Sequence, residues 1–142
     1  MTESVVIRWQ LRDSLVGYML RDPGFEVVAT GGASFDPAVG VTLPAQRQSS
    51  GELRASGSVV LRAHDGALTV PLVGVRIHEQ TLWIAAPGGG EEAPEQAFVT
   101  LSGQQEAGVF QTQLAAESDA LFLYNYVPGA DFGRLEVRVV AE

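Results

Sequence analysis

The chain has 142 residues, 46% of them hydrophobic, which predicts a single domain with one sizeable core. It contains no cysteine, so disulfides, thiolate metal ligands, cysteine nucleophiles and thioether-linked cofactors are excluded. The net charge of −8 and the lack of a basic stripe argue against nucleic acid or an anionic membrane surface as a partner. No stretch approaches the roughly 18 apolar residues of a membrane-spanning helix, so we expect no membrane insertion.

The distribution of apolar residues predicts a mainly β fold. Short runs of Val, Ile, Leu and Phe recur about every ten residues, separated by many of the 16 glycines. This pattern is typical of an antiparallel β-sandwich or barrel-like domain. The first such run, residues 4–9, predicts the first strand.

A short helix is predicted next, at residues 10–20, because Asp22, Pro23 and Gly24 follow it as stop signals. At about 100° per residue, one broad stripe of this helix contains its large apolar side chains. The stripe consists of Leu11, Leu15, Tyr18 and Met19. We therefore expect the side chain of Tyr18 to point toward the body of the protein.

Two segments follow the helix. Residues 25–30 and 33–36 flank Gly31 and Gly32 and predict a small hairpin. The segment 37–51 is predicted to be a loop with a short extended piece at 41–43.

Residues 57–70, GSVVLRAHDGALTV, give the clearest structural signal of the sequence. Asp65 and Gly66 fit a two-residue turn, which sets the register of a hairpin and places His64 opposite Ala67 at its tip. One face of this hairpin is then wholly apolar and predicted to lie in the core. That face consists of Val59, Leu61, Ala63, Leu68, Val70 and Leu72. His64 is expected on the other face, beside a small residue.

The second half of the chain continues the β pattern. A turn is predicted at Glu79 and Gln80, an exposed acidic loop at 87–96, and a short helical turn near 118–125 with Ser118 as its N-cap. Strands are predicted at 75–78, 81–86, 97–101, 108–116 and 134–140.

Most catalytic motifs are absent. There is no G-x-S-x-G elbow, no G-x-G-x-x-G fingerprint, and no metal-ligand motif around the two histidines. Tyr18, His64 and Tyr126 remain as polar or aromatic side chains at the ends of predicted elements. Taken singly, each is more commonly a structural residue, so residue logic alone gives a β-rich binding domain.

Several motifs, in order, resemble the haem-binding conserved-region domain of the HtaA family of actinobacterial haem-uptake proteins. They are WQLRDSLVGYML with its helix tyrosine, the glycine-punctuated FEVVATGGASFDP, the histidine hairpin GSVVLRAHDGALTV, and the late YVPGADF. The resemblance covers residues 1–142 as one HtaA-like haem-binding domain. The tyrosine helix and the histidine hairpin are its most specific parts.

The resemblance implies a haem site. Tyr18 would be the axial ligand of the iron, His64 its hydrogen-bonding partner, and Tyr126 a third pocket residue, with Tyr124 as the alternative to Tyr126. A phenolate favours ferric iron, and a second donor helps a tyrosine to act as phenolate at neutral pH. Arg62, on the predicted strand face of His64, is our own candidate for a contact with a haem propionate.

The function expected from this resemblance is non-enzymatic binding of ferric haem for uptake, transfer or storage, with other haem-transfer proteins as partners. A haem-dependent peroxidase-like enzyme is a weaker alternative, because no second histidine is evident for acid–base work on the opposite haem face. An adhesion or structural module that keeps the fold without haem is a third. An exposed haem face would also favour a homodimer. The compartment is expected to be cytoplasmic for a complete chain, and the cell surface for an excised domain.

Overall fold

The structure, a computed structural model, describes part of the chain in detail. The described residues are 3–63, 68–85, 95–106, 108–116, 118 and 129–140, without the side chains of 103–106. The elements are β1 (Glu3–Leu11), α1 (Asp13–Leu20), β2 (Glu26–Thr30), β3 (Ser34–Asp36), β4 (Gly40–Arg47), β5 (Leu53–Ala55), β6 (Ser58–Ala63), β7 (Leu68–Leu72), β8 (Arg76–His78), β9 (Thr81–Ala85), β10 (Glu95–Glu106), β11 (Val109–Leu114) and β12 (Asp131–Val139). The prediction of a mainly antiparallel β fold with one short N-terminal helix is confirmed.

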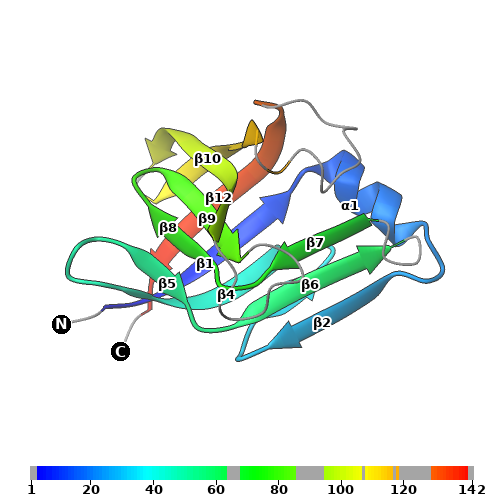
Figure 1. Cartoon of the computed structure of the whole chain (residues 1–142), viewed down its shortest axis with the longest axis horizontal. Coiled ribbons are helices and arrows are strands. Elements are labelled where there is room, and N and C mark those ends of the chain that lie inside the picture. The colour runs from blue at the N-terminus through cyan, green and yellow to red at the C-terminus, as the bar shows by residue number, and fades with distance from the viewer. Residues whose placement is uncertain are drawn as a thin grey trace.

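The larger sheet closes into an eight-stranded antiparallel barrel (Figure 1). Its strands follow the order β1, β12, β11, β10, β9, β8, β5 and β4, and β4 pairs back with β1 to complete the ring. Strand β3 pairs with residues 40–42 of β4, whereas β5 pairs with residues 45–47. Closure leaves the ring without unpaired edges, which is how barrels avoid exposing backbone donors and acceptors.

A three-stranded sheet of β2, β6 and β7 packs beside the barrel, where β6 contacts β4 and β7 contacts β9. Alternate residues of β6 and β7 face the barrel and are buried, because successive side chains of a strand point to opposite faces. They join the barrel interior in one apolar cluster. The two sheets therefore share a core.

Three aromatic rings fill the barrel interior. Trp9 meets Phe98 edge to face at 5.5 Å between ring centroids, and Phe98 meets Phe132 in the same way at 5.9 Å. All three side chains are fully buried. The indole Nε1 of Trp9 donates a hydrogen bond to the carbonyl of Phe132 at 3.2 Å, so burial leaves this N–H satisfied.

The predicted hairpin at 57–70 is confirmed within the described residues. Ala63 pairs with Leu68, Leu61 with Val70, and Val59 with Leu72, and all six side chains are buried. The turn at Glu79 and Gln80 is confirmed as well, since both residues have positive φ and join β8 to β9.

Three predictions about the first third of the chain are wrong. The helix begins at Asp13, not residue 10, because Gln10 and Leu11 pair with β12 and extend β1. The segments around Gly31 and Gly32 do not pair with each other, because β2 pairs with β6 while β3 pairs with β4. They form a corner between the two sheets rather than a hairpin.

The third error concerns residues 37–51. Residues 40–47 form the full strand β4, which pairs with β1 along its length, where a loop was predicted. Pro44 obscured this strand in the sequence, because proline lacks the N–H that a central strand uses for pairing.

Candidate functional site

Helix α1 presents Tyr18 to solvent. Leu15 and Met19 are buried on its inner side, whereas the side chain of Tyr18 is 52% exposed. Tyr18 lies about 80° around the helix from the centre of the stripe that Leu15 and Met19 form, at about 100° per residue. The expectation that Tyr18 points into the body of the protein is therefore wrong: its phenol ring lies at the surface.

The start of α1 is held by Arg12. The Nη1 of Arg12 donates to the carbonyl of Asp131 at 3.0 Å, and its Nε donates to the Ser14 hydroxyl at 2.9 Å. Asp13 places an acidic side chain in the first turn, where the helix dipole favours negative charge. The helix, and with it Tyr18, is thereby fixed to β12 of the barrel.

The helix also packs against β6, so the tyrosine helix and the predicted histidine hairpin come together. Figure 1 shows α1 beside the C-terminal end of β6 and the start of β7. Ala63, the last residue of β6, directly precedes His64 in the sequence.

Arg62 lies on the outer face of the small sheet. Its Nη1 is 3.8 Å from Oε1 of Glu26 on the paired strand β2, and both side chains are more than half exposed. A second polar contact crosses the same two strands, where the hydroxyls of Thr30 and Ser58 are 2.7 Å apart. Arg62 is therefore accessible to a ligand, in competition with Glu26.

The remaining predicted site residues fall outside the described residues. They are His64, Tyr124 and Tyr126, together with all but the first position of the helical turn at 118–125. Ser118 is described and buried. Its hydroxyl donates to the Ala97 carbonyl at 2.6 Å and accepts from Nε2 of Gln96 at 2.9 Å, which ties this segment to β10.

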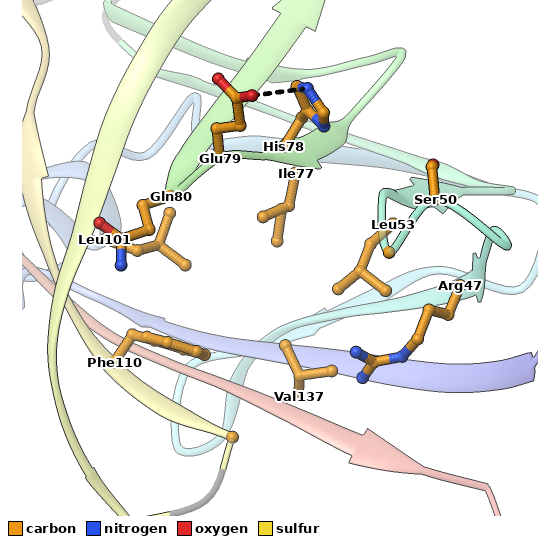
Figure 2. A pocket seen from close by; sticks show the side chains of 12 residues that line it. Arg47, Ser50, Leu53, Ile77, His78, Glu79, Gln80, Leu101, Phe110 and Val137 are labelled. Atoms are coloured by element: carbon orange, nitrogen blue, oxygen red, sulfur yellow. Dashed lines mark ion pairs between the residues drawn. The ribbon is translucent and has the colours of Figure 1, made fainter.

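The structure adds a feature that the sequence did not reveal, a cavity of about 460 Å³ in the barrel mouth (Figure 2). Its walls come from β4, β5, the β8–β9 turn, β10, β11 and β12. Strand β1 relates the cavity to the helix. Its last residue, Leu11, pairs with Gly133 and leads into α1. Its first residue, Glu3, lies at the opposite end and pairs with Arg47, which lines the cavity. The cavity and Tyr18 thus belong to opposite ends of the barrel.

No helix among the described residues is long and apolar enough to cross a membrane. No group of three or more His, Asp or Glu side chains gathers within the described ranges to hold a metal ion.

Solved structures of known proteins share the fold of this chain, whereas comparisons of its sequence found no match. The sequence matches no protein-family model and no curated protein sequence. Among solved structures, it is similar to the haem-binding protein HtaB of Corynebacterium glutamicum, with a TM-score of 0.70, 14% identity, and coverage of 100% of this chain and 96% of that one.

Two further structures from the same organism are similar. For the C-terminal domain of HtaA the TM-score is 0.66 at 12% identity, covering 97% of this chain and 96% of that chain. For the N-terminal domain of HtaA the TM-score is 0.65 at 13% identity, covering 100% and 99%. The resemblance seen in the sequence motifs is confirmed at the level of the fold: this chain has the fold of the HtaA-type domains.

Proposed function

We propose that this protein binds ferric haem reversibly and without catalysis, with the phenolate of Tyr18 as axial ligand of the iron. The observation that carries the proposal is the exposed phenol of Tyr18, on a helix fixed to a barrel that shares its fold with the haem-binding protein HtaB. An axial ligand must reach a cofactor that arrives from solvent. A half-exposed side chain on an anchored helix fits that requirement.

The chemistry of the described residues also fits haem. Tyrosine is one of the side chains that hold haem iron in proteins, and its anionic oxygen favours the ferric state. When bound, haem supplies the iron and an apolar porphyrin surface. A bound haem iron would take the oxygen of Tyr18 as an anionic ligand.

The supporting roles are part of the proposal. His64 donates a hydrogen bond to the phenolate oxygen of Tyr18, Tyr126 lines the pocket, and Arg62 contacts a propionate. The packing of α1 against β6, the strand that leads to His64, supports the pairing of Tyr18 with His64. Such a site suits haem uptake, transfer or storage, with haem exchanged with other haem-transfer proteins.

A hemin titration followed by visible absorption tests the proposal. Wild-type protein is expected to bind one hemin per chain and to develop the charge-transfer absorption of a ferric tyrosinate. Tyr18→Phe removes only the ligating oxygen, so we expect that absorption to vanish and the affinity to fall at least tenfold. His64→Ala is expected to retain binding with a shifted spectrum.

Tyr124→Phe is the comparison variant: it removes the same hydroxyl from the tyrosine that is the alternative to Tyr126 in the pocket, so it is expected to keep the ferric tyrosinate absorption. If Tyr18→Phe and Tyr124→Phe bind hemin with the wild-type spectrum, Tyr18 is not the ligand. If the folded wild-type protein does not bind hemin at all, the domain keeps the fold without the cofactor and belongs among adhesion or structural modules.

A further inference from the structure

The cavity at the barrel mouth has the dimensions of a ligand site. Its volume of about 460 Å³ lies within the range of roughly 300–1,000 Å³ found for small-molecule sites. An eight-stranded barrel is just wide enough either to be filled by side chains or to hold one small ligand. Here the aromatic rings of Trp9, Phe98 and Phe132 fill one part of the interior, and the mouth beyond it stays hollow.

The wall of the cavity is mostly apolar. Figure 2 shows Leu53, Ile77, Leu101, Phe110 and Val137 around one open space. Leu53 and Leu101 are buried, whereas Ile77, Phe110 and Val137 are only partly buried, so the last three still offer apolar surface to a ligand. These residues come from five different strands.

The polar groups on this wall favour an anion. The guanidinium of Arg47 extends into the cavity toward Val137 in Figure 2, and the side-chain amide of Gln80 lies across from it. The Nε of Arg47 is buried and lies 3.0 Å from Oε1 of Glu3, but forms no hydrogen bond within the described part of the chain. The forked guanidinium therefore retains N–H groups that can donate hydrogen bonds to a carboxylate.

Two acidic residues lie near this wall. Glu3 is the nearer to Arg47, with its Oε1 3.0 Å from Nε, so a ligand carboxylate has to compete with Glu3 in a pair whose side chains are 41% and 49% exposed. Glu79 is 84% exposed and pairs with Nε2 of His78 at 3.6 Å. Figure 2 shows this pair at the rim, on the side away from Arg47. The net charge of −8 repels anions at long range, but at physiological ionic strength that repulsion is largely screened beyond about 8 Å.

From the cavity and the guanidinium of Arg47 we propose a second ligand site in the barrel mouth, for a small carboxylate with an apolar body of the medium-chain fatty acid class. The carboxylate pairs with Arg47, while the chain extends across the cavity against Ile77, Phe110 and Val137, toward the side on which Gln80 lies. The site is distinct from the proposed haem site, because Arg47 and Tyr18 belong to opposite ends of the barrel.

Decanoate, used below its micelle concentration, is the probe. Calorimetric titration of haem-free protein is expected to give saturable binding of one decanoate per chain. In ¹H–¹⁵N correlation spectra we expect decanoate to shift the amide signals of Gly51, Leu101 and Gly108, which line the cavity, and to leave those of α1 unchanged. Protein saturated with hemin is expected to bind decanoate with the same affinity.

Two variants separate a specific pairing from general charge. Arg47→Gln is expected to weaken decanoate binding about tenfold, because a charge-assisted hydrogen bond is lost, and to leave binding of the uncharged decanol unchanged. Arg54→Gln is the matched control: Arg54 on the neighbouring β5 also faces a glutamate, Glu52 at 3.4 Å, but does not line the cavity.

The proposal fails if decanoate does not saturate, if its amide shifts map to α1, or if hemin displaces it. Equal weakening by Arg47→Gln and Arg54→Gln would also overturn it, because the charge would then act only at long range. The shift mapping uses wild-type protein, so the test stands even if Arg47→Gln does not fold. Saturation by decanoate, the shift map and the two variants are all measured on haem-free protein, so these results do not depend on whether Tyr18 binds haem.

Discussion

Arg62 and Glu26 face each other across β6 and β2, with 3.8 Å between guanidinium and carboxylate. An exposed pair of this kind stabilises a fold by at most about 1 kcal/mol. It is a weak restraint, so an anionic ligand such as a haem propionate would displace Glu26 at little cost. If Arg62 contacts a propionate, Glu26 therefore acts as a competitor for the same guanidinium.

Opposite effects of two substitutions are expected from this competition. Arg62→Ala removes the propionate contact and is expected to raise the hemin Kd about two- to fivefold, the range of an exposed ion pair. Glu26→Gln frees Arg62 and removes a negative charge, so hemin should bind more tightly. Hemin titrations measure both. An unchanged affinity for Arg62→Ala would remove Arg62 from the site.

Arg76 is held more firmly than Arg62. Its guanidinium forms a two-bond contact with Glu95 at 2.8 and 2.9 Å, a third hydrogen bond with Glu52 at 3.0 Å, and lies 5.6 Å from the ring centroid of Trp83. The hydrogen bonds that Arg76 donates to Glu95, and then those to Glu52, raise the pKa of Arg76 above its ordinary value against the opposing effect of burial. Arg76 therefore keeps its charge between the two carboxylates.

Arg76→Gln is expected to lower the free energy of unfolding by about 1–2 kcal/mol, because two carboxylates lose a forked partner and Trp83 loses a cation. Arg54→Gln, which loses only one 3.4 Å contact with Glu52, is expected to cost less than about 0.5 kcal/mol. Urea denaturation of both variants checks this. Equal losses would mean that the network around Arg76 adds nothing beyond a surface ion pair.

At the scale of elements, the corner between β1, β11 and β12 positions the tyrosine helix. Gly133 pairs with Leu11 just before α1 begins, next to a register shift between Thr112 and Gln113. Its φ is +107°, and a Cβ at this position would collide with the carbonyl oxygen of Gln10. The buried hydroxyl of Thr112 donates to the Gly133 carbonyl at 2.9 Å and secures the bulge.

Gly133→Ala is expected to lower the free energy of unfolding by about 3 kcal/mol or more, since it combines a backbone collision with an unfavourable φ. Gly51→Ala is the control with a similar φ of +93° and no heavy atom within 4 Å of the added Cβ. It is expected to cost about 1 kcal/mol. A similar loss of unfolding free energy in both variants would show that the backbone at the bulge shifts and relieves the collision.

The sequence pattern predicted strands best where two strands that pair with each other are adjacent in the sequence. Residues 57–70 hold β6 and most of β7 close together in the sequence, so alternation and the Asp–Gly dipeptide predicted the observed pairing, from Val59 with Leu72 to Ala63 with Leu68. The strands on either side of Gly31 and Gly32 have the same sequence pattern whether they pair with each other or belong to two different sheets. Their actual partners lie elsewhere in the chain, because β2 pairs with β6 and β3 pairs with β4.

At the scale of the whole molecule, barrel closure was not predictable, because β1 joins β4 and β12 from opposite ends of the chain. The cavity was missed for the same reason: its lining comes from six segments that share no motif. The sequence motifs correctly indicated the HtaA-type fold. They did not indicate that Tyr18 lies at the surface, since the eight-residue α1 buries only a narrow stripe.

Tyr18, the proposed haem ligand, and Arg47, the proposed carboxylate ligand, lie at opposite ends of the barrel, so mapping where a porphyrin binds distinguishes the two sites. Gallium protoporphyrin IX, a diamagnetic stand-in for ferric haem, is added to ¹⁵N-labelled protein and followed by ¹H–¹⁵N correlation spectra. We predict shifts in the amide signals of α1, from Val16 to Leu20, and none at Gly51 or Gly108. Shifts confined to Gly51 and Gly108, with α1 unchanged, would place the porphyrin in the barrel mouth and contradict the assignment of Tyr18 as its ligand.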